Sequence, residues 1–549
     1  MTVKNISSAS GLHPIVMDLL LRRGFRTEAE IFSFLNPAWE SLESPYVFQD
    51  MRKAVQRIRE AIAKRQKILV YGDYDVDGVT ASAILVPALL QLGADVQAHV
   101  PHRVSEGYGL NLRSLEPWVA KKIALVITVD NGITGVEAVR YLKENKVDVI
   151  VVDHHVPKDE VPPADAIISA SVNDRKGDAN LAACGLAFKL VWALTEDLEK
   201  AKDYLDLVTL GTVADLAPVV GDNRILLRHG LRAVANSPKA GLRALMESAA
   251  LRPLSLTYRD LAFGLGPRIN ASGRMGTPMT AFKLLTTTNA TEARNLAQIL
   301  EHGNKDRQRV EAEAYLDAAR VVEKRLLPEH RDFLVVESPD WHEGVLGIVA
   351  SRLVERFGRP TLVIAMREGL GKGSGRCTPA FSLFETVSRC EDLLVTFGGH
   401  AQACGLTVRQ ENIGELRDRL NRLVRESGAP AGPVQRRVSD VEIGPQQLDM
   451  VLVKDLERMA PFGPGNPAPL FLTRGMQVRG DVKKRGKDTL QCWMSDDAGQ
   501  VTCEVIGFRQ YENWQAQGQK KSRLDIVYRP ALKNFNGIET IQLELESWA

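Results

Sequence analysis

The chain has 549 residues, 44% of them hydrophobic and 25% charged, with a formal net charge of only +2. This composition is typical of a globular protein of two to four domains and excludes an intrinsically disordered chain. Because the overall charge is nearly neutral, a nucleic-acid partner would have to bind local basic patches.

Three features of the sequence favour a location in the cytoplasm. No apolar run reaches membrane-spanning length, and the first residues, MTVKNISSASGLH, lack the apolar core of a signal peptide. The six cysteines form no C-x-x-C pair, which favours reduced thiols over disulfides or a zinc site. We therefore expect a cytoplasmic protein that does not contact a membrane.

The first part of the chain predicts a helical lead-in and then an α/β domain. Residues 1–50 contain the amphipathic segments HPIVMDLLLRRG and EAEIFSFLNP. Within residues 51–290, the strand patterns KILVYG, DVQAHV, IALVITVD and VDVIVVD alternate with helical patterns such as VTASAILVPALLQLG. This alternation predicts a mostly parallel, doubly wound sheet, which we expect to form a catalytic domain.

The second part of the chain predicts three further units. Residues 291–327 have the pattern of a long connecting helix, with a break near Gly303. Residues 328–430 show strands near FLVVES and TLVIAM and a helix in VLGIVASRLVERFG, typical of a second α/β domain. Residues 431–549 contain about five short strand patterns, which predict an OB-type β-barrel, and the preceding APAGPVQR resembles a linker.

The stretch YGDYDVDG places Asp73, Asp75 and Asp77 directly behind a predicted strand. Like charges this close repel each other, and a divalent cation is their usual partner. An EF-hand is disfavoured, because a strand precedes the loop and Ile84 stands where that loop needs Glu. For this stretch alone, a solvated acidic turn remains the alternative.

Further acids and imidazoles follow other predicted strands. Asp130 in TVDNG and Asp153 in VVDHH follow strands, His154 and His155 stand beside Asp153, and Asp215 lies in GTVADLAPV. Carboxyl ends of parallel strands meet at one edge, where ligands bind. Such ligands suit Mn²⁺ or Mg²⁺, and two ions bridged by one Asp is an arrangement used for phosphoester hydrolysis. For the DHH triplet by itself, helix capping and core hydrogen bonds remain the alternative.

Glycine-rich segments carry donors that suit phosphate groups. We interpret these segments as turns, in which Arg and His favour binding over a purely structural role. His342, beside Trp341, is a further candidate. The alternative is that this pair only packs at an interface, where a tryptophan is common. The candidates in the glycine-rich segments are Arg268, Asn270, Ser272, Arg274, Ser374, Arg376 and His400.

The predicted barrel offers aromatic side chains for base stacking. Several should belong to its core, and one or two are expected to stack on bases. Its densest basic cluster is KKRGK, residues 483–487. The aromatic residues in question are Trp493, Phe508, Tyr511, Trp514, Tyr528 and Phe535.

The motifs DYDVDG, VDNG, VVDHH and GTVADLAPV resemble those of the DHH phosphoesterase superfamily, and GSGRC and FGGHAQACGL resemble its companion DHHA1 domain. PHRVSEGYGL, GLGPRINASGRMG, WHEGVLGIVASRL and PFGPGNPAPLF resemble the bacterial RecJ family, the single-strand-specific 5′-to-3′ DNA exonucleases. The resemblance covers nearly the whole chain.

The resemblance implies roles for the candidate residues. Asp130 would bridge two divalent ions, and Asp73 would be a further ligand with a less defined role. The catalytic group would be Asp77, Asp130, Asp153 and His155, in which Asp153 orients a histidine and His155 contacts the scissile phosphate. The remaining implied metal ligands are Asp75, Asp77, His154 and Asp215, and Arg103 and Tyr108 in PHRVSEGYGL are further substrate-binding candidates.

The implied function is metal-dependent hydrolysis of single-stranded DNA from the 5′ end, releasing mononucleotides in DNA repair and recombination. The protein would act as a monomer, with a helicase and a single-strand-binding protein as candidate partners. One alternative is a phosphodiesterase for small or oligoribonucleotide substrates, which the added barrel disfavours. The other is a non-catalytic nucleic-acid-binding scaffold, which should have lost metal ligands that are all present here.

Overall fold

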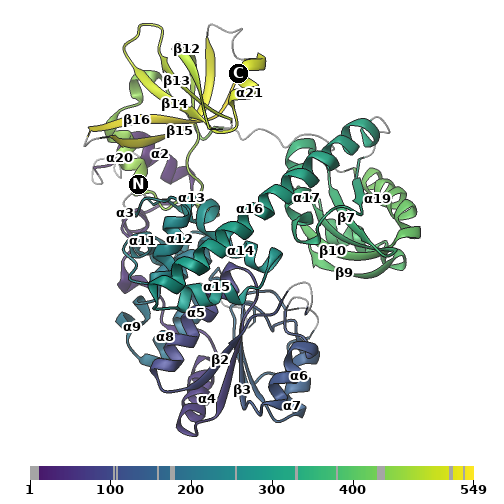
Figure 1. The fold of residues 1–549 in the computed structure, drawn as a ribbon. Helices are drawn as coiled ribbons and strands as arrows, with labels where there is room; N and C mark the ends of the chain where they lie inside the picture. The colour runs from purple at the N-terminus through teal and green to yellow at the C-terminus, as the bar shows by residue number, and fades with distance from the viewer. Residues whose placement is uncertain are drawn as a thin grey trace.

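The computed structural model contains three bodies of secondary structure, each built on its own sheet (Figure 1). We call them the first lobe (β1–β5 with α4–α15), the second lobe (β6–β10 with α17–α19) and the C-terminal lobe (β11–β16 with α20 and α21). The structure describes residues 11–102, 106, 109–157, 160–172, 180–253, 256–327, 332–378, 381–428, 439–486, 488–517, 523–535 and 538–549.

The first lobe contains a parallel sheet in the order β2-β1-β3-β4-β5. Its strands are β1 (Lys67–Tyr71), β2 (Asp95–His99), β3 (Leu125–Val129), β4 (Asp148–Val152) and β5 (Ala166–Ile168). Ile68 and Val70 of β1 pack on one face, whereas Leu69 and Tyr71 pack on the other. Both faces are therefore buried, as in parallel sheets generally, and the predicted doubly wound fold is confirmed.

Helices cover both faces of this sheet. Helices α4, α5 and α8 share a buried cluster with one face, and α6 and α7 share another with the opposite face. The helices of the first lobe are α4 (Met51–Ala63), α5 (Val76–Gln91), α6 (Leu112–Ala120), α7 (Val136–Glu144), α8 (Ala183–Thr195), α9 (Leu198–Lys202), α10 (Leu205–Ala214), α11 (Gly221–Ala235), α12 (Ala240–Ser248), α13 (Tyr258–Asp260), α14 (Gly266–Met275) and α15 (Met279–Thr286).

Helix α16 (Ala290–Val321) runs from the first lobe to the second (Figure 1). It passes through Gly303 without interruption, so the break predicted there is wrong. Glycine weakens an isolated helix by only about 1 kcal/mol. Here the neighbouring Leu300 and Asn304 are buried by tertiary packing, which offsets that penalty. A π-helical turn, Val322–Leu326, ends the connection.

The second lobe contains a mixed sheet in the order β6-β7-β8-β10-β9, in which only β6 and β7 pair in parallel. Its elements are β6 (Leu334–Ser338), α17 (Leu346–Phe357), β7 (Thr361–Arg367), β8 (Leu370–Arg376), α18 (Leu383–Ser388), β9 (Leu394–His400), β10 (Ala403–Arg409) and α19 (Ile413–Ser427). The predicted second α/β unit is therefore present.

The GSGRC segment lies mostly in strand β8, so its interpretation as a turn is wrong. Glycines alternate along β8 because one face of the strand is crowded. A Cβ on Gly373 would lie 2.9 Å from Leu406 Cδ1, and one on Gly375 would lie 2.7 Å from Cys404 Sγ. Since successive side chains of a strand point to opposite faces, Ser374 and Arg376 point away from this crowded side.

The lead-in helices α2 (Pro14–Arg22) and α3 (Glu28–Leu35) pack with the C-terminal lobe. Buried residues such as Leu20 share one hydrophobic cluster with Met459 and Phe471, far away in sequence. The strands of this lobe are β11 (Val441–Glu442), β12 (Phe471–Arg485), β13 (Thr489–Ser495), β14 (Thr502–Gly507), β15 (Leu524–Phe535) and β16 (Ile538–Trp548), and its helices are α20 (Met450–Arg458) and α21 (Tyr511–Gln517).

The sheet of the C-terminal lobe has the order β11-β12-β13-β14-β16-β15, and β12 also pairs with β15. This curled, partly open arrangement is the OB-type architecture that the strand patterns predicted. Within the described ranges, none of the helices has the length and apolar character needed to cross a membrane.

Candidate active site

The candidate metal ligands gather at the carboxyl edge of the first sheet. Asp73 follows β1, Asp130 follows β3 and Asp153 follows β4. The strand order reverses direction between β1 and β3, and open α/β sheets bind ligands at such a switch point. The fold therefore brings these three predicted positions to one crevice.

Backbone N–H groups hold two of the clustered carboxylates. Asp75 caps helix α5 and accepts a hydrogen bond from Gly78 N at 3.1 Å. Asp77 is only 1% exposed and accepts from Ala183 N at 2.6 Å and from Cys184 N at 2.9 Å, at the start of α8. A buried carboxylate that is fixed in this way does not belong to a solvated acidic turn.

Asp130 combines an unusual backbone conformation with a buried carboxylate. Its backbone has φ 63°, a left-handed conformation that Asp tolerates better than most residues. Its Oδ1 lies 3.2 Å from His154 Nε2, and both atoms are buried without a hydrogen-bond partner. Burial, and then the nearby charges of Asp75 and Asp77, raise the pKa of Asp130 well above its ordinary value.

The ligand atoms form three overlapping sets, and within each set all atoms lie within 4.8 Å of one another. Asp130 and His154 each belong to two sets. The sets are Asp130 with His154 and His155, Asp77 with His154 and Asp215, and Asp73 with Asp75 and Asp130. Buried carboxylates that repel one another and an orphaned imidazole nitrogen fit divalent cations, because cations satisfy both.

His155 is oriented by Asp153. The His155 Nδ1–H donates to Asp153 Oδ1 at 2.7 Å, while Asp153 also accepts from Ile133 N at 3.0 Å. This hydrogen bond, together with the charge of Asp153, raises the pKa of His155 to about 9. Although burial acts to raise the pKa of Asp153, its bond to His155 holds that pKa below the ordinary value. The pair therefore presents a protonated, half-exposed imidazole beside the carboxylates.

Asp215 completes the cluster from the C-terminus of α10. Its Oδ2 lies 4.0 Å from His154 Nδ1. Burial, and then the charges of Asp77 and Asp75, raise the pKa of Asp215 to about 8. In the absence of cations, the cluster therefore holds protons at neutral pH that a metal ion would displace.

This proton uptake predicts how stability depends on pH. The Asp215 carboxyl has a pKa of about 3.9 when unfolded and about 8 when folded. It stabilises the metal-free fold below the unfolded pKa, and that stability is lost as the pH rises through the folded pKa. Mn²⁺ competes with these protons, so thermal melts should show a larger Mn²⁺-induced rise in Tm near about pH 8 than near about pH 6. Equal rises at both pH values would contradict the assignment.

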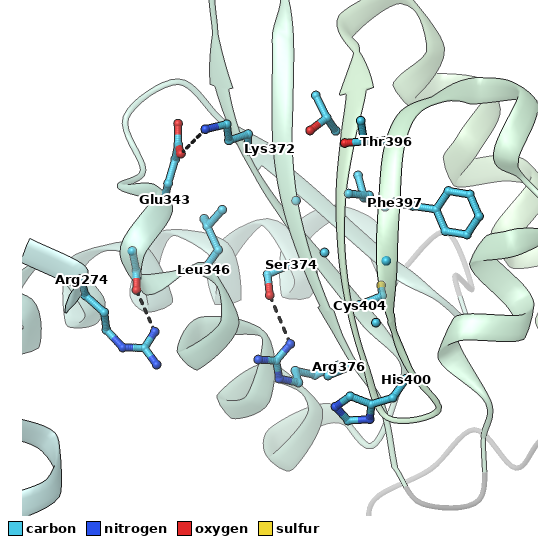
Figure 2. Close-up of a pocket in the computed structure, with 18 of the residues that line it drawn as sticks. Arg274, Glu343, Leu346, Lys372, Ser374, Arg376, Thr396, Phe397, His400 and Cys404 are labelled. Atoms are coloured by element: carbon cyan, nitrogen blue, oxygen red, sulfur yellow. Dashed lines mark hydrogen bonds and ion pairs between the residues drawn. The ribbon is translucent and has the colours of Figure 1, made fainter. Parts of the chain in front are cut away.

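A pocket of about 580 Å³ lies beside the carboxylate cluster. Tyr74, between Asp73 and Asp75, lines it from the first lobe together with Arg274. Figure 2 shows Arg376 and His400 extending into it from the second-lobe sheet, with Arg274 opposite. Arg376 Nη1 donates to Ser374 Oγ at 3.2 Å and to Gly375 O at 2.7 Å.

Four predicted residues therefore meet at this pocket: Arg274, Ser374, Arg376 and His400. Its lining also includes glycines, the apolar residues Leu346, Phe397 and Leu406, and the carboxylate of Glu343. The donors of this lining suit a phosphate-bearing chain.

The segment GLGPRINASGRMG forms a π-helical turn and helix α14, so its interpretation as a glycine-rich turn is wrong. Arg268 is engaged in packing, because its Nε pairs with Glu301 of α16 at 2.6 Å and its Nη1 donates to Gly264 O. Ser272 is buried and donates to Ile269 O at 2.7 Å.

Other predicted binding residues lie away from the pocket lining. Asn270 lies partly buried on α14. His342 caps a short 3₁₀ helix through its Nδ1, which accepts from Gly344 N at 3.0 Å, and Trp341 is buried. Arg103 and Tyr108 lie outside the described residues.

Sequence reasoning missed several residues of the site. Tyr74 was visible between two acids, but nothing in the sequence placed it in a pocket with the second lobe. Lys372, which pairs with Glu343 at 3.0 Å, also lines the pocket. The backbone donors of Ala183 and Cys184 could not be found, because any residue type supplies an N–H group.

Family models match three parts of the chain. The DHH family, N-terminal domain, matches residues 67–212, the DHHA1 domain matches residues 331–426, and the RecJ OB domain matches residues 439–547. These ranges contain the first sheet with Asp73, Asp75, Asp77, Asp130 and Asp153, the second-lobe sheet, and nearly all of the C-terminal sheet, whereas Asp215 lies three residues beyond the DHH match.

Relatives align over the whole chain. The single-stranded-DNA-specific exonuclease RecJ of Bacillus subtilis (strain 168) is 33% identical over 555 residues, covering 100% of this chain and 69% of the relative. The crystal structure of RecJ from Thermus thermophilus in complex with Mn²⁺ superposes with a TM-score of 0.83 at 29% identity, covering 100% of this chain and 77% of that one. Its complex with Mg²⁺ gives a TM-score of 0.75 at 28% identity, covering 100% and 76%.

The fold and the clustered carboxylates thus define a DHH-type protein with a DHHA1 domain and an OB domain. The chain belongs to the RecJ family.

Proposed function

We propose that this protein hydrolyses single-stranded DNA from the 5′ end and releases mononucleotides, using divalent cations at the DHH cluster. The observation that supports this most directly is the pair of buried atoms without a hydrogen-bond partner, Asp130 Oδ1 and His154 Nε2, which lie 3.2 Å apart among three overlapping ligand sets. Tyr74, which stands between two of the clustered acids, also lines the pocket that the second lobe forms. The relatives are named as exonucleases specific for single-stranded DNA.

In this proposal, Mn²⁺ or Mg²⁺ would be held by Asp73, Asp75, Asp77, Asp130, His154 and Asp215, and Asp130 would contribute to two ligand sets. Bound cations would lower the pKa of a water molecule and neutralise charge on the attacked phosphate. Asp153 holds His155 in the protonated form, and its imidazolium would donate to an oxygen of the scissile phosphate. Substitutions that remove either the metal ligands or the His155 imidazole should abolish turnover while leaving the sheet intact.

Polarity would come from the pocket in the second lobe. A terminal 5′-phosphate is the most distinctive group at that end of a strand. Ser374 and Arg376 of β8 line the pocket and would bind this phosphate. Arg274 and His400 line the same space. Arginine suits this role because its planar fork contacts two phosphate oxygens at once.

The C-terminal lobe would add binding contacts to long single strands. Trp493 and Phe508 are 51% and 44% exposed, whereas Trp514 and Tyr528 are buried in the core. The guanidinium of Arg259, on the first lobe, lies 4.5 Å from the Phe508 ring centroid, so this aromatic lies where the two lobes meet. Base stacking here would add affinity that a short strand cannot use.

We predict that Trp493→Ala and Phe508→Ala each weaken binding to a long single strand by about 1–3 kcal/mol. Cleavage of a short strand should be unchanged, because that strand does not reach the C-terminal lobe. Fluorescence anisotropy with both lengths measures the difference. Phe32→Ala, an exposed aromatic on α3, is the matched control and should bind both strands normally. Unchanged binding of long strands by both variants would assign the lobe another task.

Activity assays test the proposed function. Purified protein should digest single-stranded DNA with Mn²⁺ or Mg²⁺, leave double-stranded DNA and RNA largely intact, and stop with EDTA. Preferred digestion of RNA or of dinucleotides would favour the small-substrate alternative, and binding without cleavage would favour the scaffold.

We also propose a cytoplasmic monomer that works in DNA repair and recombination with a helicase and a single-strand-binding protein. All six cysteines are free, which agrees with a reducing compartment. Light scattering of the purified protein should give the mass of one chain, and a mass twice as large would contradict this part of the proposal.

A further inference from the structure

Asp215 differs from the other ligand candidates in how it is held. Asp77 and Asp153 are each fixed by two backbone N–H groups. Within the described part of the chain, no hydrogen bond reaches the Asp215 carboxylate, whose Oδ2 lies 4.0 Å from His154 Nδ1. Its position therefore depends on the backbone that follows α10, where Leu216 adopts φ 59° and Ala217 N returns to Thr212 O at 3.2 Å.

That backbone continues into residues 218–220, which pack on the loop 461–467 of sequence PFGPGNP. Val219 N donates to Pro464 O at 2.7 Å. The contact is close because the loop contains glycine: a Cβ on Gly463 would lie 2.7 Å from Val219 Cγ2 and 3.0 Å from Tyr258 Cε2. Tyr258 in turn donates to Val213 O, two residues before Asp215, at 3.4 Å. The loop thus contacts the chain after the ligand directly, and the chain before the ligand through Tyr258.

The loop is itself firmly held from its other side. Buried Asn466 donates to Met459 O at 2.9 Å and Pro461 O at 2.8 Å, and Met459 belongs to the core of the C-terminal lobe. Arg23 of the lead-in donates to Asn466 Oδ1 at 2.6 Å and to Pro467 O at 2.5 Å. The loop therefore connects the C-terminal lobe, through these hydrogen bonds, to the segment that follows Asp215.

We infer that the loop 461–467 is a positioning element for the metal centre: it fixes residues 218–220 and thereby holds Asp215 where it completes its ligand set. The inference rests on the metal centre proposed above. It gives the PFGPGNP loop a role in metal binding that is separate from any role in DNA binding. Metal affinity then depends on the contact between the C-terminal lobe and residues 218–220, although none of the proposed ligands belongs to that lobe.

The test is Gly463→Ala, whose Cβ must displace Val219 or Tyr258. Calorimetric titration of the metal-stripped protein with Mn²⁺ should show affinity about 10-fold weaker, the lower range for residues that support metal ligands. At limiting Mn²⁺ the kcat should fall with KM for single-stranded DNA unchanged, and saturating Mn²⁺ should restore it. Gly444→Ala is the matched control, because its Cβ would meet nothing closer than 3.7 Å.

If Gly463→Ala does not fold, Arg23→Ala loosens the loop from outside by removing two hydrogen bonds and should weaken Mn²⁺ binding in the same direction. A folded variant of either kind with wild-type Mn²⁺ affinity would overturn the inference. If the wild-type protein itself binds no Mn²⁺, the metal centre fails instead, so the two failures are distinguishable.

Discussion

Asp130→Asn should abolish hydrolysis and, at the same time, raise the melting temperature of the metal-free protein. Activity should fall by about 100-fold or more, as when other groups that stabilise transition-state charge are removed. Stability should rise because the raised pKa of Asp130 means that its charged form opposes folding at neutral pH without metal. Asparagine is preferable to alanine because it tolerates the left-handed backbone of residue 130.

Rate assays and thermal melts in EDTA measure the two effects on one preparation. Asp95→Asn is the matched control, since Asp95 is exposed at the amino end of β2, at the opposite edge of the same sheet. It should leave both rate and stability unchanged. More than about a tenth of wild-type activity in Asp130→Asn would refute its place between two ions, since a charge-stabilising group contributes far more than this. A lower melting temperature in Asp130→Asn would mean that the Asp130 carboxylate makes stabilising interactions that the structure does not show.

Arg376→Ala should selectively impair digestion of strands that carry a 5′-phosphate. The loss should be on the order of 1.5–3 kcal/mol, the usual range for a charge-assisted hydrogen bond. Strands with a 5′-hydroxyl should be digested about as well as by the parent enzyme. The pocket supports this expectation because Arg376 projects from β8 beside Ser374 and His400, within the same cavity that Tyr74 connects to the acidic loop.

Competition between 5′-phosphorylated and 5′-hydroxyl strands in one reaction measures this preference directly. Arg409→Ala is the matched control, because Arg409 is an exposed arginine on the neighbouring strand β10, outside the pocket. It should keep the parental preference. Equal losses on both kinds of end in Arg376→Ala would place Arg376 at the scissile phosphate or in the fold, and end recognition would then lie elsewhere.

Residues whose role depends on local pattern were predictable from the sequence. Buried strands such as KILVY follow from their apolar runs, and the acids after β1, β3 and β4 converge because parallel strands share one carboxyl edge. The convergence of Asp130 and His154 to 3.2 Å is consistent with that argument. The OB-type lobe followed from its short alternating strands and turns.

Residues whose role depends on tertiary packing were not predictable. Arg268 and Arg376 both stand in glycine-rich segments, yet Arg268 pairs with Glu301 whereas Arg376 lines the pocket. GSGRC was expected to form a turn because glycine is common in turns, but its glycines make room for Leu406 and Cys404 in a crowded strand. Likewise, nothing local predicts that lead-in residues such as Leu20 share a core with Phe471.

The central claim is that the cluster around Asp130 drives metal-dependent digestion from the 5′ end. The most direct measurement is a time course on one single-stranded DNA, labelled at its 5′ end in one reaction and at its 3′ end in the other, with Mn²⁺ or with EDTA. With Mn²⁺, the 5′ label should appear at once as a mononucleotide, while the 3′-labelled strand shortens progressively. Early release of the 3′ label, a ladder from the 5′-labelled strand, or undiminished cleavage in EDTA would contradict the claim.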